Sequence, residues 1–340
     1  MDKIRQNLFI YGVGVVFLLI LVLAATGVID LYLQTVIMFI GVNIIFATSL
    51  SIVNGYMGEF SCGHAGFMAV GAYVSSVLSV TLFTANKLTG APLLPPSLSV
   101  ILFPVIILVG GIVAAVAGLL VAIPSFKTRD DYLAIITIAV NFIIVTLINN
   151  MAVVGGSRGF MGMKKVLYAM KAVVPFPYIL FWVITFAILT VFIIRRFVSS
   201  IYGKGIIAIK QDEVAAEIMS IDTNKMKLVA FMFSSGLAGV SGGLFAHVIG
   251  YVNPGSFSIL KSTEALVMVY MAGMGSLGGS VISAILFTIL LELLRPFQIL
   301  KWVIIPLLLI LLMQFRPEGL MGDKELPDFF PKLKKYYKFR

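Results

Sequence analysis

The chain has 340 residues, of which 60% are hydrophobic and only 12% are charged. A typical soluble domain has about 25% charged residues, and the mean hydropathy of +1.07 is too apolar for a chain surrounded by water. The same composition excludes intrinsic disorder, which needs polar and charged residues. The net charge of +10 does not indicate nucleic-acid binding, because membrane proteins collect Lys and Arg in their cytoplasmic loops.

Ten apolar runs along the chain predict membrane-spanning helices. A hydrocarbon core about 30 Å thick needs about 20 helical residues. The first run is too long for the core of a signal peptide, so we expect it to stay as an uncleaved helix. The sequence therefore predicts an all-α, multi-pass membrane protein with about ten transmembrane or partly re-entrant helices. The predicted spans are 8–29, 31–53, 61–83, 98–122, 132–150, 174–194, 228–250, 262–277, 279–295 and 301–315.

The distribution of basic residues predicts that both termini are cytoplasmic. In that orientation 17 of the 25 Lys and Arg residues lie in cytoplasmic segments and 8 lie outside, as the positive-inside rule requires. The loop at 151–173 fits least well, because its four basic residues then lie outside. The opposite assignment places the six basic residues of 195–227 outside, which is less favourable.

The predicted organisation has three parts. A cytoplasmic N-terminus at 1–7 precedes a transmembrane domain at 8–322. Within that domain, 195–227 is expected to be a cytoplasmic loop, and 323–340 is expected to be a basic cytoplasmic tail.

No catalytic, cofactor-binding or metal-binding set is recognisable in the sequence. It lacks the G-x-x-x-x-G-K-[ST] phosphate loop, the G-x-S-x-G elbow and the H-E-x-x-H motif, so we expect neither enzyme activity nor a cofactor. The single cysteine, Cys62, excludes a disulfide framework. His64 and His247 have no carboxylate at ligand spacing and are expected to be hydrogen-bonded packing residues.

Glycines crowd two span ends, at 55–71 and at 273–279. Interrupted helices at membrane depth are tolerated where protein or a water-filled cavity surrounds the freed backbone groups, and transporters build binding sites from such breaks. The alternative is close packing between helices, which small residues permit.

The acidic residues of the apolar segments lie near span ends, whereas a proton-driven pump would need them at depth. They are Asp30, Glu59, Glu264 and Glu292. Glu292 can pair with Arg295 almost one turn later. Glu264 begins the short eighth span, where the helix dipole by itself favours a carboxylate.

The loop at 195–227 contains a predicted short helix over 212–219. Asp212 can cap it, and an acidic first turn suits the helix dipole. Such a helix either lies on the membrane or fills a groove on a partner, and Ala215 and Ala216 make its middle narrow enough for close docking. Its predicted apolar stripe consists of Ile207, Val214, Ile218 and Ile221.

Six motifs in order carry a family resemblance. They are GEFSCGHAGFMAVGAY at 58–73, DYLAIIT at 131–137, NNMAVVGGSRG at 149–159, DEVAAEIMSI at 212–221, MAGMGSLGG at 271–279 and FRPEGL at 315–320. Together they resemble the LivM-type permeases of branched-chain amino acid ABC importers, in which 212–221 corresponds to the "EAA" coupling loop. Ser220 stands where that family usually has glycine, and 156–159 adds a cation to an outer loop.

The resemblance implies a subunit of an importer in the inner membrane of a prokaryote. The chain would pair with a second, homologous permease, and two ABC ATPase subunits would dock on the cytoplasmic side. An extracytoplasmic binding protein would deliver branched-chain or other hydrophobic amino acids, and ATP binding would drive alternating access through the coupling helix. Related permeases carry urea, short amides or nucleosides, so these substrates remain alternatives.

Two groups of site residues follow from this interpretation. One group is predicted to line the translocation pathway, and Asn43 is a further polar candidate for that lining. The alternative for these polar side chains is hydrogen bonding between helices. The expected ATPase-coupling residues are Asp212, Glu213, Ala215, Ala216, Met219, Ser220 and Ile221. The expected translocation-pathway residues are Gly63, His64, Thr137, Asn141, Gly273 and Gly275.

Two other classes of protein compete with this interpretation. An ion-coupled secondary transporter would need carboxylates deep in the membrane. A channel or a structural membrane anchor would leave the coupling-like loop at 195–227 without a role.

Overall fold

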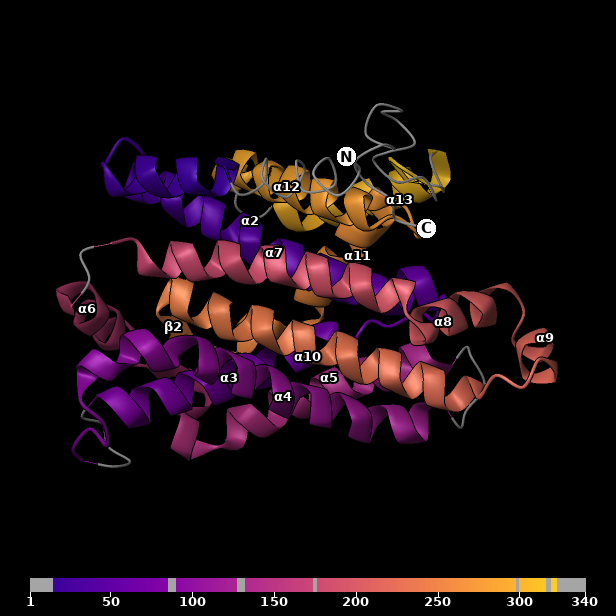
Figure 1. Ribbon diagram of the computed structural model, residues 1–340, viewed down its shortest axis with the longest axis horizontal. Helices are drawn as coiled ribbons and strands as arrows, with labels where there is room; N and C mark the ends of the chain where they lie inside the picture. The colour runs from indigo at the N-terminus through magenta and orange to yellow at the C-terminus, as the bar shows by residue number, and fades with distance from the viewer. Residues whose placement is uncertain are drawn as a thin grey trace, which may run out of the picture.

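The computed structural model describes residues 15–84, 90–126, 132–173, 176–297, 300–315 and 319–322. The predicted N-terminus at 1–7 and tail at 323–340 lie outside these residues. The described chain is a bundle of long, roughly parallel and antiparallel helices (Figure 1). This confirms the predicted all-α class.

Six of the described helical segments are long and apolar enough to cross a membrane. Each agrees with a predicted span to within a few residues at most ends. They are α2 with the π-helical η1 (Leu31–Met57), α3 (His64–Phe83), η2 with α4 (Pro96–Ser125), α5 (Tyr132–Asn150), α7 (Tyr178–Ser199) and α10 (Thr223–Ile249).

The other predicted spans form shorter helices within the described residues. Val15–Ala25 is the described part of the first predicted span. α11 (Ile259–Ala272), α12 (Leu277–Leu293) and α13 (Lys301–Phe315) follow α10. α11 has only 14 residues, which is about 21 Å of helix. It is therefore too short to cross the bilayer alone.

α10 lies at the centre of the bundle and packs against α2, α3 and α4. The contacts are close because small residues meet there. A Cβ on Gly71 would lie 2.1 Å from the carbonyl oxygen of Gly239, and one on Gly242 would lie 1.9 Å from that of Met68. At these positions the glycines allow close packing between helices, which is the alternative role given for them above.

One end of the bundle carries α8 (Ile201–Gln211) and α9 (Glu213–Ile218). Lys210 Nζ donates to the carbonyl oxygens of Gly55, at 2.9 Å, and Met274, at 3.3 Å. The backbone of Leu320 bonds to Met271 O at 2.9 Å, so the last described residues lie at this end too. We call it the α9 end.

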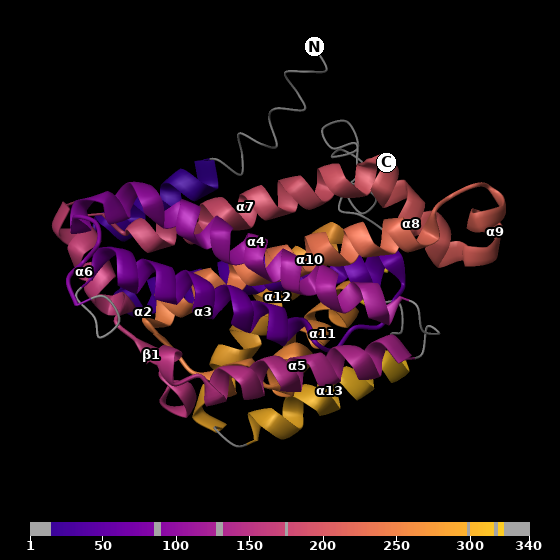
Figure 2. The same cartoon turned by 90° about the horizontal axis from the view of Figure 1, so that it is seen from below.

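The loop at 151–173 forms a structured cap at the opposite end of the bundle (Figures 1 and 2). It contains η3 (Ala152–Val154), η4 (Gly156–Arg158), β1 (Phe160–Met161) and the amphipathic helix α6 (Met163–Val173). β1 pairs antiparallel with β2 (Tyr251–Val252), which follows α10. The sequence did not predict these elements, but it did predict that this loop and 195–227 lie at opposite ends of the spans.

Candidate functional site

α9 begins at a side-chain cap, as predicted. Asp212 ends α8 in an extended conformation, and its Oδ1 accepts the N–H of Ala215 at 3.0 Å. The break at Asp212 makes α8 and α9 two separate helices. Ile207 therefore belongs to α8 and Val214 to α9, so the predicted single apolar stripe over 207–221 is wrong.

The C-terminus of α9 closes in a Schellman turn. The N–H of Ile221 donates to Ala216 O at 3.1 Å, and the N–H of Ser220 donates to Glu217 O at 2.9 Å. Ser220 has φ 63°, the left-handed region. This is the position at which glycine normally ends a helix. The departure from the family pattern therefore preserves the turn at the cost of a strained serine.

α9 presents an apolar face to its surroundings. Val214, Ile218 and Met219 are 67%, 77% and 77% exposed, whereas Ala216 is only 4% exposed. Ala215 is exposed as well. The two alanines of α9 thus differ in burial, with Ala216 packed inward and Ala215 on the surface.

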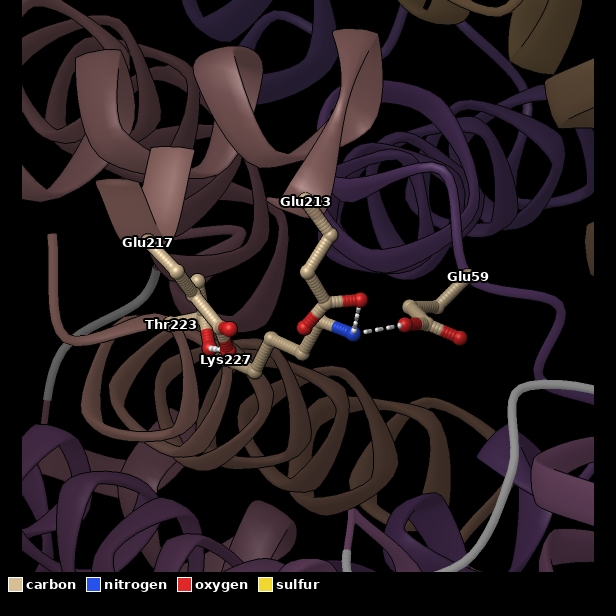
Figure 3. Close-up of polar contacts among 5 residues, drawn as sticks. All are labelled: Glu59, Glu213, Glu217, Thr223 and Lys227. Atoms are coloured by element: carbon tan, nitrogen blue, oxygen red, sulfur yellow. Dashed lines mark hydrogen bonds and ion pairs between the residues drawn. The ribbon is translucent and has the colours of Figure 1, made fainter. Parts of the chain in front are cut away.

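An ion network ties α9 to the bundle (Figure 3). Lys227 Nζ, on α10, lies 2.7 Å from Glu59 Oε1 and 2.8 Å from Glu213 Oε2. The side chains of Lys227 and Glu59 are only 7% and 9% exposed. Beside them, Thr223 Oγ1 donates to Glu217 Oε1 at 3.0 Å. A buried charge needs such partners, because desolvation without them is costly.

Glu59 and Lys227 are functional candidates that the sequence analysis missed as a pair. They are 168 residues apart, and each stood at the edge of a predicted span. Their only sequence signal was a charge at the end of an apolar run. The network connects α9 to the non-helical segment 58–63, which leads into α3.

A cavity of about 440 Å³ lies beside this network. It faces α8 and the start of the segment at 58–63. Its lining is Asn54, Met57, Gly58, Glu59, Phe60, Ile209, Lys210, Gln211, Asp212, Glu213, Lys227, Tyr270 and Met274.

Four of the predicted pathway residues are brought together where the segment at 58–63 enters α3. A Cβ on Gly63 would lie 2.1 Å from the carbonyl oxygen of Thr137, and the N–H of Cys62 donates to Thr137 Oγ1 at 3.2 Å. His64 Nε2 lies 3.0 Å from Ser49 Oγ. On α5, one turn after Thr137, Asn141 is 1% exposed.

Several polar atoms in this region have no hydrogen-bond partner among the described residues. They are both amide atoms of Asn141, Nδ1 of His64 and Oγ of Ser61. Buried polar atoms are normally paired by protein or water. This region is therefore a polar patch inside an apolar bundle.

The other polar candidates form ordinary interhelical bonds. Asn43 Nδ2 donates to Thr288 Oγ1 at 2.9 Å. Asn43 therefore forms an interhelical hydrogen bond, the alternative given for it above. His247 contacts Gly243 O at 2.7 Å and Ser79 Oγ at 2.9 Å, as expected of a packing histidine. Within the described residues, no group of three His, Cys, Asp or Glu side chains is arranged to hold a metal ion.

Gly273 and Gly275 lie away from this patch, in the buried turn between α11 and α12 at the α9 end. Gly273 has φ 104°, and the N–H of Gly275 donates to Gly273 O at 2.9 Å. The turn at 273–275 therefore lies beside Lys210 and Gly55 at the α9 end, whereas Gly63 lies at the polar patch.

The comparisons with known proteins agree with this architecture. The family model described as "Branched-chain amino acid transport system / permease component" matches residues 32–313. The chain is 29% identical to the high-affinity branched-chain amino acid transport system permease protein LivM of Salmonella typhimurium, over 98% of this chain and 78% of that protein. It is 24% identical to the LivH permease protein of Escherichia coli, over 85% of this chain and 96% of that protein. No solved structure matches the chain.

The fold and the comparisons define a multi-pass helical protein of the prokaryotic inner membrane, with a short capped helix projecting from one end. The chain belongs to the family of branched-chain amino acid transport permeases, since that model covers most of its length. Against Escherichia coli proteins, its identity is 29% to LivM and 24% to LivH. The LivM-type resemblance stated from the motifs is therefore confirmed.

Proposed function

We propose that this chain is a permease subunit of an ATP-driven importer for branched-chain or other hydrophobic amino acids. It pairs with a second, homologous permease, and two ATPase subunits bind at the α9 end. An extracytoplasmic binding protein delivers the substrate at the opposite end. The names of the LivM and LivH relatives support the substrate class and the pairing of two permeases.

The observation that carries the proposal is α9. Its exposed apolar face, Val214, Ile218 and Met219, fits a groove on a partner better than water. Its first residue, Glu213, is held by the buried Lys227. A partner that moves α9 therefore moves the start of α10 and, through Glu59, the segment at 58–63.

The consequence for transport is conformational coupling between two sites. When ATP binding brings the ATPase subunits together, α9 is displaced with them. The segment at 58–63 then shifts against Thr137 and the polar patch, and access changes from one face of the membrane to the other. The permease itself moves a substrate and breaks no bond.

The test is uptake of radiolabelled leucine into proteoliposomes that contain this chain with its partner subunits. The proposal predicts uptake that needs ATP, the ATPase subunits and the binding protein together. Uptake driven by an ion gradient without the ATPases would show a secondary transporter. Passive flux in the absence of ATP would show a channel.

A further inference from the structure

A second cavity, of about 510 Å³, lies between the end of α10 and the start of α11. That volume is within the usual range for small-molecule sites, about 300–1,000 Å³. Its lining comes from one continuous stretch of chain. The lining residues are Tyr251, Asn253, Gly255, Ser256, Ser258, Leu260, Lys261 and Glu264.

The cavity contains a nearly buried ion pair. Lys261 Nζ lies 2.7 Å from Glu264 Oε2, and the two side chains are 14% and 11% exposed. The ammonium group also lies 5.5 Å from the ring centre of Phe245, at cation–π distance. A pair of apolar residues often packs as stably as a buried ion pair, so packing by itself does not require these charges.

The helix that carries the ion pair begins next to the polar patch. Ser262 Oγ accepts the N–H of Ala65, in the first turn of α3, at 3.0 Å. His64 in turn contacts Ser49, which is eight residues before the end of the Leu31–Met57 helix. At 1.5 Å per residue, this contact is about 12 Å inside the bundle from the α9 end. Nearly buried ionisable groups within a membrane-spanning bundle mark ligand and ion pathways.

We propose that Lys261 and Glu264 bind the two charged groups of a zwitterionic amino acid on its way through the permease. The ammonium of Lys261 binds the α-carboxylate of the substrate, and the carboxylate of Glu264 binds the α-ammonium. The dipole of the substrate thus lies antiparallel to that of the protein pair, and each charge keeps a partner when the substrate leaves. This assignment rests on the proposed function and deepens it.

The two charges of this ion pair distinguish among the candidate substrates. Urea and short amides are neutral and offer no charge to exchange with the pair. An amino acid offers one charge of each sign, which matches Lys261 and Glu264. The hydroxyl and amide groups of Ser256, Ser258 and Asn253 lie on the same wall for further hydrogen bonds.

The experiment uses the reconstituted complex and a double variant, Lys261→Met with Glu264→Leu. This variant removes both charges together and so leaves neither buried and unpaired. We expect the complex to assemble and leucine uptake to fall at least about tenfold, because charged hydrogen bonds to the substrate are lost. Wild-type uptake by the double variant would overturn the assignment, since the pair would then be a packing element.

A matched control is the pair Glu292→Leu with Arg295→Met. Those side chains form the same i,i+3 ion pair, at 3.0 Å, but Arg295 is 67% exposed and neither residue lines either cavity described above. Uptake by the control should equal that of wild type. Absence of ATP-dependent uptake by the wild-type complex would instead refute the proposed function, so the two failures are distinguishable.

Charge selectivity gives a second readout that does not depend on the double variant. Leucine binding to the purified complex is competed with 3-methylbutylamine, which lacks the carboxylate, and with 4-methylpentanoate, which lacks the amine. In Glu264→Gln, we expect competition by the amine to weaken at least about tenfold while competition by the acid persists. Equal weakening of both competitors, or of neither, contradicts a direct contact with the α-ammonium.

Discussion

The ammonium group of Lys227 lies 2.8 Å from the carboxylate of Glu213, so the first residue of α9 is bonded to the second turn of α10. The same ammonium group holds Glu59 at 2.7 Å. One buried cation thus joins the exposed helix of the α9 end to the segment at 58–63 and to the central helix α10.

Loss of this link should uncouple transport without unfolding the protein. In Glu213→Gln, Lys227 keeps Glu59 as its partner, so we expect normal assembly. Leucine uptake should fall at least about tenfold, since a charge-assisted bond worth about 1.5–3 kcal/mol is lost. The measurement is ATP-dependent uptake per assembled complex.

Glu217→Gln is the control for that variant, because Glu217 is on the same helix and contacts only Thr223 in this network. It should reduce uptake much less. Equal uptake by the two variants would show that the Lys227 bond does not transmit movement. Lys227→Met, by contrast, should reduce stability, because it removes the cation that Glu59 and Glu213 share.

Glutamate substitutions at the two alanines of α9 should impair the protein in different ways. Ala215 is exposed, so Ala215→Glu should leave the helix intact and abolish uptake by placing an unpaired charge in the partner groove. Ala216 is 4% exposed, so Ala216→Glu should also disrupt the helix itself. Copurification of the ATPase subunits and limited proteolysis of the 195–227 region distinguish these results. Normal uptake with both variants would count decisively against a coupling helix.

At position 220, replacement of serine by glycine should be tolerated better than replacement by any other residue. With φ at 63°, Ser220→Gly removes a left-handed strain of about 1–2 kcal/mol, offset in part by the entropy of glycine. We expect a small gain in thermal stability of the loop. Ser220→Val should lower it clearly, because a β-branched side chain is least compatible with positive φ. The opposite order, measured by protease resistance of the loop, would refute the Schellman geometry.

The glycine at the polar patch should behave differently from a packing glycine. A Cβ on Gly63 would lie 2.1 Å from Thr137 O, and one on Gly71 would lie 2.1 Å from Gly239 O. Gly71→Ala separates α3 from α10 and should reduce the amount of assembled protein. Gly63→Ala displaces the entrance to α3 from Thr137 of α5 and, if this contact belongs to the pathway, should reduce uptake more than assembly.

Gly275→Val extends the comparison to the turn at the other end of α11. We expect it to reduce uptake more than assembly as well. Membrane abundance, partner copurification and initial uptake rate are measured for all three variants. If uptake per assembled complex stays at the wild-type value in Gly63→Ala and Gly275→Val, these two glycines are packing residues.

Orientation in the membrane can be tested with two described lysines. After Cys62 is replaced by serine, a cysteine at Lys171, in α6, should react with an impermeant thiol reagent in intact cells. A cysteine at Lys225, at the start of α10, should react only after permeabilisation. Both positions are exposed. The reverse pattern would invert the predicted topology.

Local features of the fold could be predicted from the sequence. The spans followed from apolar length, and α9 followed from Asp212 with an acidic first turn, because these signals depend on neighbouring residues. The cap at 151–173 could not be predicted in this way, since β1 finds its partner strand about 90 residues later. The predicted eighth span at 262–277 also differs in its bounds from α11, which begins at Ile259 and ends at Ala272 before the turn at Gly273.

The contacts of the site between residues far apart in the chain could not be predicted from the sequence for the same reason. Nothing in the local pattern around Glu59 indicates Lys227, and nothing around Thr137 indicates that its carbonyl oxygen touches Gly63. The sequence identifies Glu264 only as an acid at the start of a short span, where the helix dipole by itself favours a carboxylate. Its cavity and the burial of its pair with Lys261 became apparent only in three dimensions.

α11 has 14 residues, with neither glycine nor proline among them. It carries Lys261 and Glu264 near one end, and the turn after its other end is held by Lys210 at Met274. A rod of about 21 Å that pivots by about 10° at one end sweeps about 4 Å at the other. If α8 rotates and this turn moves with it, α11 moves as one rigid rod, and the two charged groups shift by that distance relative to a bound substrate.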